Sequence, residues 1–201
     1  MPKTKVKLIE NFLVVWDSAE GSELYKAGYY GKPLGIPKPK IPEFDAPLIL
    51  DLMEGLYLLE NKKIEIYEHS NEKKVSLTKL KQKAKQLYDE FEEKYAVYHD
   101  LRDSNLIVTP GIKFGCDFAV YKYGPGVEHA PYTVSVKKAG SPAAGWMDPS
   151  LSEGSRLPNE GLCWRQIMVA AVPASIAVRF SAQGRGPRKD VPELLNMLKF
   201  M

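Results

Sequence analysis

Residues 95–134 read YAVYHDLRDSNLIVTPGIKFGCDFAVYKYGPGVEHAPYTV, and this stretch carries the strongest pattern in the sequence. Apolar residues alternate with small or polar ones over positions 114–123, which predicts a strand with one aromatic face. A short Gly-Pro-Gly loop follows Tyr121, and His129 stands eight residues after that tyrosine. A tyrosine and a histidine that meet across a loop can transfer protons at a phosphodiester, so this pair is the first candidate for a site.

The length and composition of the chain restrict its class. Its 201 residues, 44% of them hydrophobic, are enough for one large domain or two small ones with a packed core. A net charge of +3 permits contact with a polyanion without requiring it. No apolar run reaches about 18 residues, and no signal-peptide pattern opens the sequence. We therefore expect a cytoplasmic protein without a membrane span.

Cysteine and histidine are scarce in this sequence. The two cysteines, Cys116 and Cys163, are typical of free thiols in a reducing compartment. The three histidines do not combine with them at the spacing of a zinc site. We expect neither a metal site nor another cofactor.

One change in composition divides the chain. Residues 1–140 contain 20 lysines and one arginine, whereas residues 141–201 contain two lysines and five arginines and are rich in Gly, Pro, Ser and Ala. This change indicates different constraints on the last third, or an unusual history of the gene.

The first 70 residues predict a small α/β unit. Strands are expected at 4–9, 12–16 and 63–68, and an extended loop rich in Pro and Gly at 28–42. Leucines recur near the helical period over 48–59 and predict a buried helix before Asn61.

The second predicted unit covers residues 75–201. Ser76 is a candidate N-cap for a long helix over 77–94 that continues to Arg102. The lysines of this helix are expected to form a solvated face, because Glu90, Glu92 and Glu93 balance them. The remaining predictions are strands at 106–109, 114–123 and 129–138, a loop at 140–162, a helix at 164–172, a strand at 176–181, a loop at 182–190 and a terminal helix or strand at 191–200. The fold class is mixed α/β, or α+β.

Three short patterns in the opening segment belong together. They are Y-x-V-Y-x-D-L-R from Tyr95, P-G-x-K-F-G-x-D-F-x-V-Y from Pro110 and H-A-x-Y-x-V from His129. In combination they resemble the catalytic domain of tRNA-intron endonucleases, also called tRNA-splicing endonucleases, of archaeal type. The patterns GYYGKP at 28–33 and LMEGLYLLENKKIEI at 52–66 resemble the small accessory domain of that family. The resemblance covers most of residues 1–138.

The resemblance implies a fold and an activity. Residues 1–70 would be the accessory domain, and residues 75–201 the nuclease-like domain, with a central mixed sheet packed on helices. Members cut precursor tRNA at the intron boundaries, within a bulge-helix-bulge, and leave a 2′,3′-cyclic phosphate and a 5′-hydroxyl without a metal. A tyrosine acts as the base, a histidine as the acid, and a lysine stabilises the charged phosphorane. By motif position, Tyr121 is the tyrosine and His129 the histidine.

Elementary chemistry agrees with these roles. The pKa of histidine lies near neutrality, so an imidazolium can protonate the leaving oxygen. The phenol of tyrosine, with an unperturbed pKa of about 10, needs nearby cations to act as a base. A lysine beside the scissile phosphate would serve both the base and the transition state.

The sequence departs from the family pattern at the lysine, which belongs at the end of a helix before the last core strand. The best local match places Ala174 there, and Ile167 where some members have an arginine that clamps a bulged base. Three alternatives stay open. The chain is an inactive form altered at this position, or it is a non-catalytic partner subunit, or another cation serves. The candidate cations are Arg165, Arg179 and Lys138.

The resemblance also implies partners. Family enzymes are dimers of dimers or heterotetramers, so a single subunit of this size would assemble into four chains, homomeric or heteromeric, on a precursor tRNA. The first alternative is a structural subunit that binds a catalytic partner and RNA but cleaves nothing. The second is a coincidental motif in an unrelated α/β binding protein.

Overall fold

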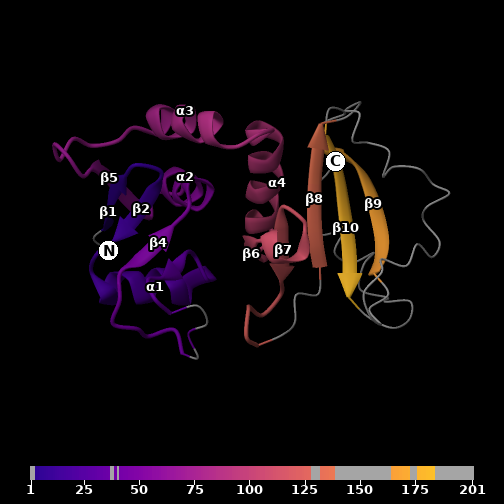
Figure 1. Cartoon of the computed structure of the whole chain (residues 1–201), viewed down its shortest axis with the longest axis horizontal. Coiled ribbons are helices and arrows are strands. Elements are labelled where there is room, and N and C mark those ends of the chain that lie inside the picture. The colour runs from indigo at the N-terminus through magenta and orange to yellow at the C-terminus, as the bar shows by residue number, and fades with distance from the viewer. Residues whose placement is uncertain are drawn as a thin grey trace. The chain divides into compact units, whose positions relative to one another are not determined.

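The computed structural model of the chain describes residues 3–36, 39, 41–127, 132–138, 164–172 and 176–183. The chain divides after Phe91 into two units, Met1–Phe91 and Glu92–Met201, and each unit has its own five-stranded sheet (Figure 1). The mixed α/β class predicted from the sequence is confirmed. None of the helices in the described part of the chain is long and apolar enough to cross a membrane.

The first sheet has the strand order β3-β4-β2-β1-β5. Strands β1 (Thr4–Ile9) and β2 (Phe12–Val15) form an antiparallel hairpin, and β5 (Ile64–Glu68) runs parallel to β1. Strands β4 (Leu48–Leu50) and β3 (Lys32–Pro33) extend the other edge. The three strands predicted for this unit are therefore confirmed, with bounds that differ by one residue at most.

Helix α1 (Ser18–Gly28) is a helix that the sequence does not predict. The side chain of Asp17 caps it by accepting a hydrogen bond from the Glu20 amide at 2.9 Å, and Tyr29 ends it in the left-handed region at φ 55°. Its large buried side chains are those of Leu24 and Tyr25. Two neighbouring apolar residues are too few to show a helical period.

The helix predicted over 48–59 is wrong in its first part. Residues 48–50 form β4, because they pair with β2, and α2 (Leu52–Glu60) begins only after Asp51. The Asp51 carboxylate accepts a hydrogen bond from the Glu54 amide, and the Glu54 carboxylate accepts one from the Asp51 amide. This capping box fixes the start of the helix.

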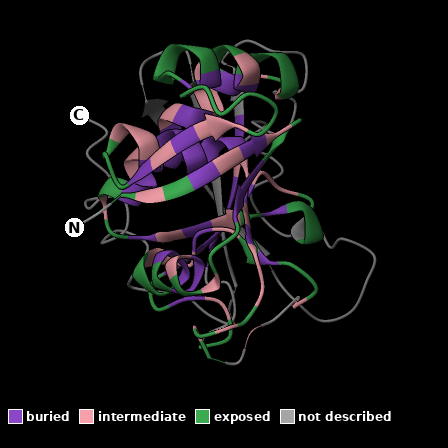
Figure 2. Ribbon diagram, turned by 90° about the vertical axis from the view of Figure 1, so that its left-hand side faces the viewer, coloured by how far each residue is buried: buried purple, intermediate pink, exposed green. Residues whose placement is uncertain are grey.

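Both helices pack against the same face of the first sheet. Gly21 of α1 lies against Leu48, and Gly55 of α2 lies so close to Leu13 that an added Cβ would sit 1.9 Å from a Leu13 methyl carbon. Leu13 and Leu48 lie on one face because they are at alternating positions of the β2–β4 ladder. Both are fully buried, as Figure 2 shows for the core of this unit. Small residues thus let the helices approach the sheet.

The single long helix predicted over 77–94 is also wrong. Ser76 caps α3 (Leu77–Leu87) as expected, but Tyr88 adopts an extended conformation and Glu90 a left-handed one at φ 54°. A second helix, α4 (Phe91–Asp103), then begins. The segment between them contains no Gly or Pro, and the stacked rings of Tyr88 and Phe91 stabilise the turn instead.

The second sheet has the strand order β6-β7-β8-β10-β9, and all its described ladders are antiparallel. Its strands are β6 (Ile107–Pro110), β7 (Phe118–Tyr121), β8 (Tyr132–Lys138), β9 (Trp164–Val172) and β10 (Ile176–Gln183). The mixed sheet expected for residues 75–201 is therefore antiparallel in its described part, and among the described strands parallel pairing is found in the first sheet, between β1 and β5.

Two predictions in this unit need correction. The strand expected over 114–123 is shorter, because a 3₁₀ turn (Ile112–Phe114) and a left-handed Gly115 at φ 67° precede β7. The helix expected over 164–172 is the strand β9. A continuous apolar run does not distinguish a buried helix from a strand, and here pairing with β10 determines the strand. The predictions for 129–131, 140–162, 184–190 and 191–200 lie outside the described residues.

Candidate active site

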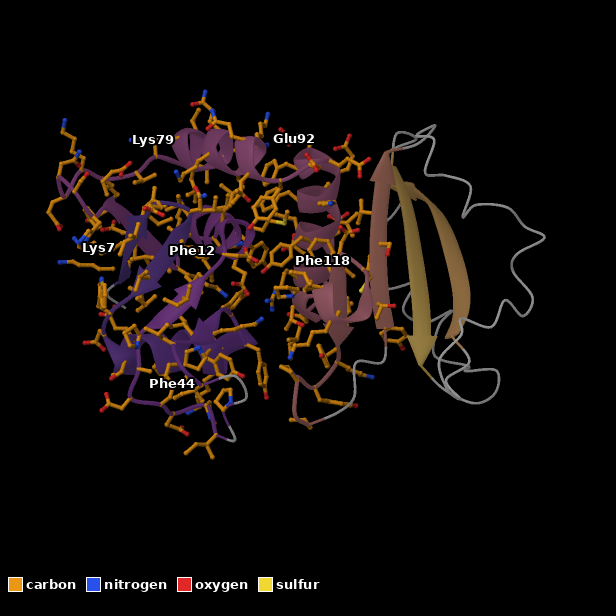
Figure 3. The ribbon with its side chains drawn as sticks, viewed as in Figure 1. Lys7, Phe12, Phe44, Lys79, Glu92 and Phe118 are labelled. Carbon is orange, nitrogen blue, oxygen red and sulfur yellow. The ribbon has the colours of Figure 1, made fainter. Side chains whose placement is uncertain are left out.

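Tyr121 is the last residue of β7, a strand whose four residues are all buried. It lies opposite Ile107 of β6 and packs against it together with Ala119, on the same face of the strand. Phe118, labelled in Figure 3, and Val120 point to the other face. There the ring of Tyr98 from α4 lies 5.8 Å from that of Phe118. Tyr121 is 8% exposed, so a packed framework fixes its position.

Arg102 joins helix α4 to the strand that pairs with Tyr121. Its Nε donates a hydrogen bond to the Tyr98 hydroxyl at 3.0 Å, and its Nη2 donates one to the Val108 carbonyl at 2.8 Å. The guanidinium carbon lies 5.4 Å from the centre of the Tyr98 ring. Arg102 is 5% exposed, so these bonds form away from water. Tyr98 and Arg102 of the Y-x-V-Y-x-D-L-R pattern therefore have a structural role.

Asp117 joins the same helix to the β7–β8 hairpin. Its Oδ1 lies 3.0 Å from the Lys94 ammonium, and its Oδ2 accepts a hydrogen bond from the Val136 amide at 2.8 Å. Its own amide donates to the Val134 carbonyl. The side chains of Lys94 and Asp117 are only 17% and 21% exposed. The Asp117 carboxylate thus holds the β7–β8 hairpin against α4.

Cys116 is held by backbone groups and is not suited to nucleophilic chemistry. Its sulfur lies 3.4 and 3.3 Å from the carbonyl oxygens of Gly111 and Phe118, either of which can accept its single S–H. Burial raises the pKa of the Cys116 thiol to about 11, so at neutral pH the thiolate is rare. Gly111 is required here, because a Cβ would lie 2.5 Å from the Cys116 sulfur.

The loop after Tyr121 leads toward the predicted histidine. Lys122 and Tyr123 are exposed, and the Lys122 ammonium lies 5.7 Å from the centre of the Tyr123 ring. His129 lies outside the described residues, and the chain is described again from Tyr132, which pairs with Val120. Because Tyr132 pairs with the residue before Tyr121, the end of β7 and the start of β8 are offset by one position in the ladder.

The strand β9 changes the interpretation of Ala174, the position aligned with the family's lysine. The alignment requires Ala174 to follow a helix, but the segment before it is the strand β9. Ala174 lies outside the described residues, and its described neighbours in the chain, Val172 and Ile176, pair with each other. Ile176 also pairs with Lys138, at the end of the sheet away from Tyr121.

The alternative cations occupy different positions along the sheet. Arg165 pairs with Ala182, and Ala182 pairs with Tyr132, so Arg165 belongs to the row that crosses the sheet at Val120. Three strand spacings, about 14 Å, separate this row's ends. Arg179 is opposite Ser135, nearer the middle of its strand. By register, Arg165 is at the same end of the sheet as Tyr121 but on the face of Val120, whereas Arg179 is on the face of Ala119 and Tyr121.

Sequence reasoning includes Arg102 and Asp117 in its motifs but assigns them no role, and it does not single out Lys94. The role of Asp117 depends on its contact with Lys94, which is 23 residues away in the sequence. The role of Arg102 depends on a hydrogen bond to a backbone carbonyl. Charged residues that stand beside buried aromatic and aliphatic positions of these motifs are the signal that could have pointed to them. Among the described residues, no three His, Cys, Asp or Glu side chains gather in a way that could hold a metal ion.

Comparison with known proteins identifies two matching family models. The model of the tRNA intron endonuclease N-terminal domain matches residues 4–81, and that of the tRNA intron endonuclease catalytic C-terminal domain matches residues 91–152. The second match contains the loop between β7 and β8 and ends before β9.

Individual relatives agree with these matches. The chain is 50% identical to the tRNA-splicing endonuclease of Hyperthermus butylicus over 125 residues. This aligned stretch covers 62% of this chain and 68% of the relative. The chain is 43% identical over 129 residues to the tRNA-splicing endonucleases of Sulfurisphaera tokodaii and Sulfolobus acidocaldarius, covering 64% of this chain and 71% and 70% of those proteins. By its two domain matches and by these identities, the chain belongs to the tRNA-splicing endonuclease family.

Proposed function

We propose that this chain is a subunit of a cytoplasmic tRNA-splicing endonuclease that cuts precursor tRNA at both boundaries of an intron. The observation that carries the proposal is the position of Tyr121. It ends a buried strand within the matched catalytic domain, and His129 follows eight residues later in the sequence. In this proposal residues 1–70 form the accessory domain and residues 75–201 the domain that carries the reaction, although helix α3 (Leu77–Leu87) belongs to the first structural unit.

The proposed reaction is a metal-free transesterification. The phenolate of Tyr121 accepts the proton of the ribose 2′-hydroxyl as that oxygen forms a bond to phosphorus. The bond from phosphorus to the 5′-oxygen breaks, and His129 as an imidazolium donates its proton to that leaving oxygen. Atoms and charges balance with a 2′,3′-cyclic phosphate and a 5′-hydroxyl as products. A cation near the phosphorane would stabilise its added negative charge.

The cation is the open part of this proposal. Three positions of the second sheet compete. The alternation of the strands favours Arg179, because its partner Ser135 shares the face of Thr133, Ala119 and Tyr121, whereas Arg165 and Lys138 share the face of Val120. An Arg179→Gln variant should then lose cleavage, whereas Lys138→Gln should retain it. If instead Ala174→Lys raises the rate, the alignment of position 174 with the family lysine is supported.

A second candidate function is a non-catalytic subunit of a heteromeric endonuclease. The observation that favours it is the alanine at position 174, together with a catalytic-domain match that ends at residue 152. The chain would then bind RNA and place a catalytic partner, within a tetramer. Cleavage by the purified chain alone distinguishes the two functions.

The experiment uses a precursor tRNA with an intron in a bulge-helix-bulge, incubated with the purified chain. We expect two cuts, products with cyclic phosphate and 5′-hydroxyl ends, and an unchanged rate in EDTA. Products with a 5′-phosphate, or activity that is lost in EDTA and restored by metal, would reject the mechanism. No cleavage by the chain alone, but cleavage after a second subunit is added, would support the non-catalytic role.

A further inference from the structure

The first sheet has one face that α1 and α2 cover and an opposite face that they leave open. Both helices pack on the face of Leu13 and Leu48, whose side chains are fully buried. The opposite face, called here the open face, is defined by a row that crosses all five strands: Lys32, Ile49, Val14, Lys7 and Tyr67. Of these five residues only Val14 is buried, so most of the open face is accessible to a large ligand.

Two large aromatic side chains stand on the open face. Phe12 pairs with Ile9, which is on the same face as Lys7, and Trp16 takes the next alternate position after Val14 (Figure 3 labels Lys7 and Phe12). Phe12 is 58% exposed and Trp16 is 56% exposed, although large aromatic residues are mostly buried in folded proteins. The packing of the first unit therefore does not account for these two rings.

Lysines stand on both sides of the strand that carries these rings. Lys32 is on β3 and Lys5 is on β1, and both are exposed. Among the described residues, no carboxylate lies within ion-pair distance of either ammonium group. Lys7 is ion-paired with Glu72, and Glu65, the partner of Lys5 in the ladder, takes part in ion pairs with other lysines. The rings are the main feature of the open face, and the lysines add positive charge beside them.

This combination of groups suits a single strand of RNA. Every nucleobase has a π-face that stacks on an aromatic ring, and the phosphates between the bases attract ammonium groups. Phe12 and Trp16 are four residues apart on an extended segment, about 13 Å. Bases stacked on each other are about 3.4 Å apart, so the two rings suit two bases of an unstacked strand. A protein partner would instead cover Lys5 and Lys32 as well, and lysine is depleted at protein interfaces.

We infer that the open face of the first sheet binds an unpaired stretch of the substrate RNA by stacking bases on Phe12 and Trp16. This inference rests on the proposed function, which supplies RNA as the ligand. The open face belongs to a different unit from Tyr121, so its role is in binding and not in the bond changes. Because an aromatic ring accepts the π-face of any base, the open face adds affinity with little choice of sequence.

The fluorescence of Trp16 measures the stacking directly. The chain has two other tryptophans, Trp146 and Trp164, so the full-length W146F/W164F variant keeps Trp16 as its only tryptophan. The probe is a short oligouridine strand, which does not pair with itself. We expect this strand to quench the fluorescence of Trp16, in step with binding measured by the anisotropy of a labelled strand. Saturated binding without quenching would overturn the inference.

The affinity of ring variants supplies a second measurement. F12L/W16L removes both rings but keeps apolar side chains, whereas F12Y/W16F keeps two rings. The control, L34A/I41A, truncates two apolar residues of the same unit that are 60% and 61% exposed. We expect F12L/W16L to bind oligouridine about 5–150-fold more weakly for each ring lost, and the other two variants to bind like the wild type. An F12L/W16L chain that is folded by circular dichroism and has the wild-type affinity would overturn the inference.

Cleavage of the precursor RNA separates this inference from the proposed function. If F12L/W16L binds and cuts the precursor as well as the wild type does, the open face has no role in RNA binding and the proposed function stands. If oligouridine quenches Trp16 but no precursor is cut, with or without a second subunit, the open face binds RNA and the proposed function fails. If F12L/W16L changes the number of subunits in light scattering but not the affinity for RNA, the open face contacts protein and the inference is wrong. A wild-type chain that binds no RNA contradicts both.

Discussion

The ammonium group of Lys94 lies 3.0 Å from a carboxylate oxygen of Asp117, and the other oxygen of that carboxylate accepts a hydrogen bond from the Val136 amide. One side chain thus joins α4, β7 and β8. Because Tyr121 is four residues further along the chain from Asp117, the same contact fixes the strand that carries the proposed base. The contacts of Asp117 therefore help to position Tyr121 for its proposed role.

Asp117→Asn should destabilise the second unit. The substitution keeps the shape but replaces a charge-assisted ion pair and hydrogen bond at a site about one-fifth exposed, so we expect a loss of about 1–3 kcal/mol. Urea unfolding of this variant measures the loss. Asp103→Asn is the control, because the His99–Asp103 pair is exposed and should contribute little. Equal effects of the two substitutions would mean that the Lys94 contact has no special role.

Arg102→Lys should be costly although it keeps the positive charge. Lysine cannot donate to the Tyr98 hydroxyl and the Val108 carbonyl in the fixed geometry of a guanidinium, and the position is buried. We expect a loss of about 2–4 kcal/mol in guanidinium unfolding, from the energies of hydrogen bonds to charged groups. A variant as stable as the wild type would show that these bonds contribute nothing to stability.

Gly55→Ala should destabilise the first unit despite the higher helix propensity of alanine. The propensity gain is about 1 kcal/mol, but the new methyl group would overlap the buried side chain of Leu13 and cost about 1–3 kcal/mol. Gly21→Ala in α1 is the comparison, because its Cβ would lie 3.0 Å from Leu48 and requires a smaller shift. Thermal unfolding should rank Gly55→Ala as the less stable variant, and the reverse order would contradict the packing described here.

Cys116 should react slowly with thiol reagents in the folded protein. Its pKa is raised to about 11 by burial, so the thiolate fraction at pH 8 is far below that of an unperturbed cysteine and grows only as the pH approaches that value. The measurement is the rate with Ellman's reagent in a Cys163→Ala background, compared between native and urea-unfolded protein. Equal rates at pH 8 would contradict the burial of this thiol.

The strands near each motif follow from the sequence because their patterns are local. β1, β5 and the start of α3 at Ser76 are predicted by alternation or by a capping residue. The division of the 48–59 segment and the turn at residues 88–90 depend on pairing and ring packing, which single-chain periodicity does not contain. The strand β9 is a similar case, because only its pairing with β10 separates it from a buried helix.

The candidate site shows the same limit. Alternation predicts a strand that contains Tyr121, although not its end there, and the resemblance to a family supplies the proposed roles of Tyr121 and His129. The contact between Lys94 and Asp117 spans 23 positions and arises only when α4 packs against the hairpin. Strand register then distinguishes Arg179, on the face of Tyr121, from Arg165 and Lys138, which composition alone cannot do.

The most direct test of the account is the single-turnover rate of precursor tRNA cleavage by Tyr121→Phe. The control is Tyr123→Phe, which removes a hydroxyl from an exposed tyrosine two residues away in the loop. If Tyr121 is the base, its variant should lose about 10²–10⁴-fold in rate and remain folded, because it removes the proton acceptor and little else. The control should keep the wild-type rate. Equal rates for Tyr121→Phe and wild type would contradict the assignment of the base.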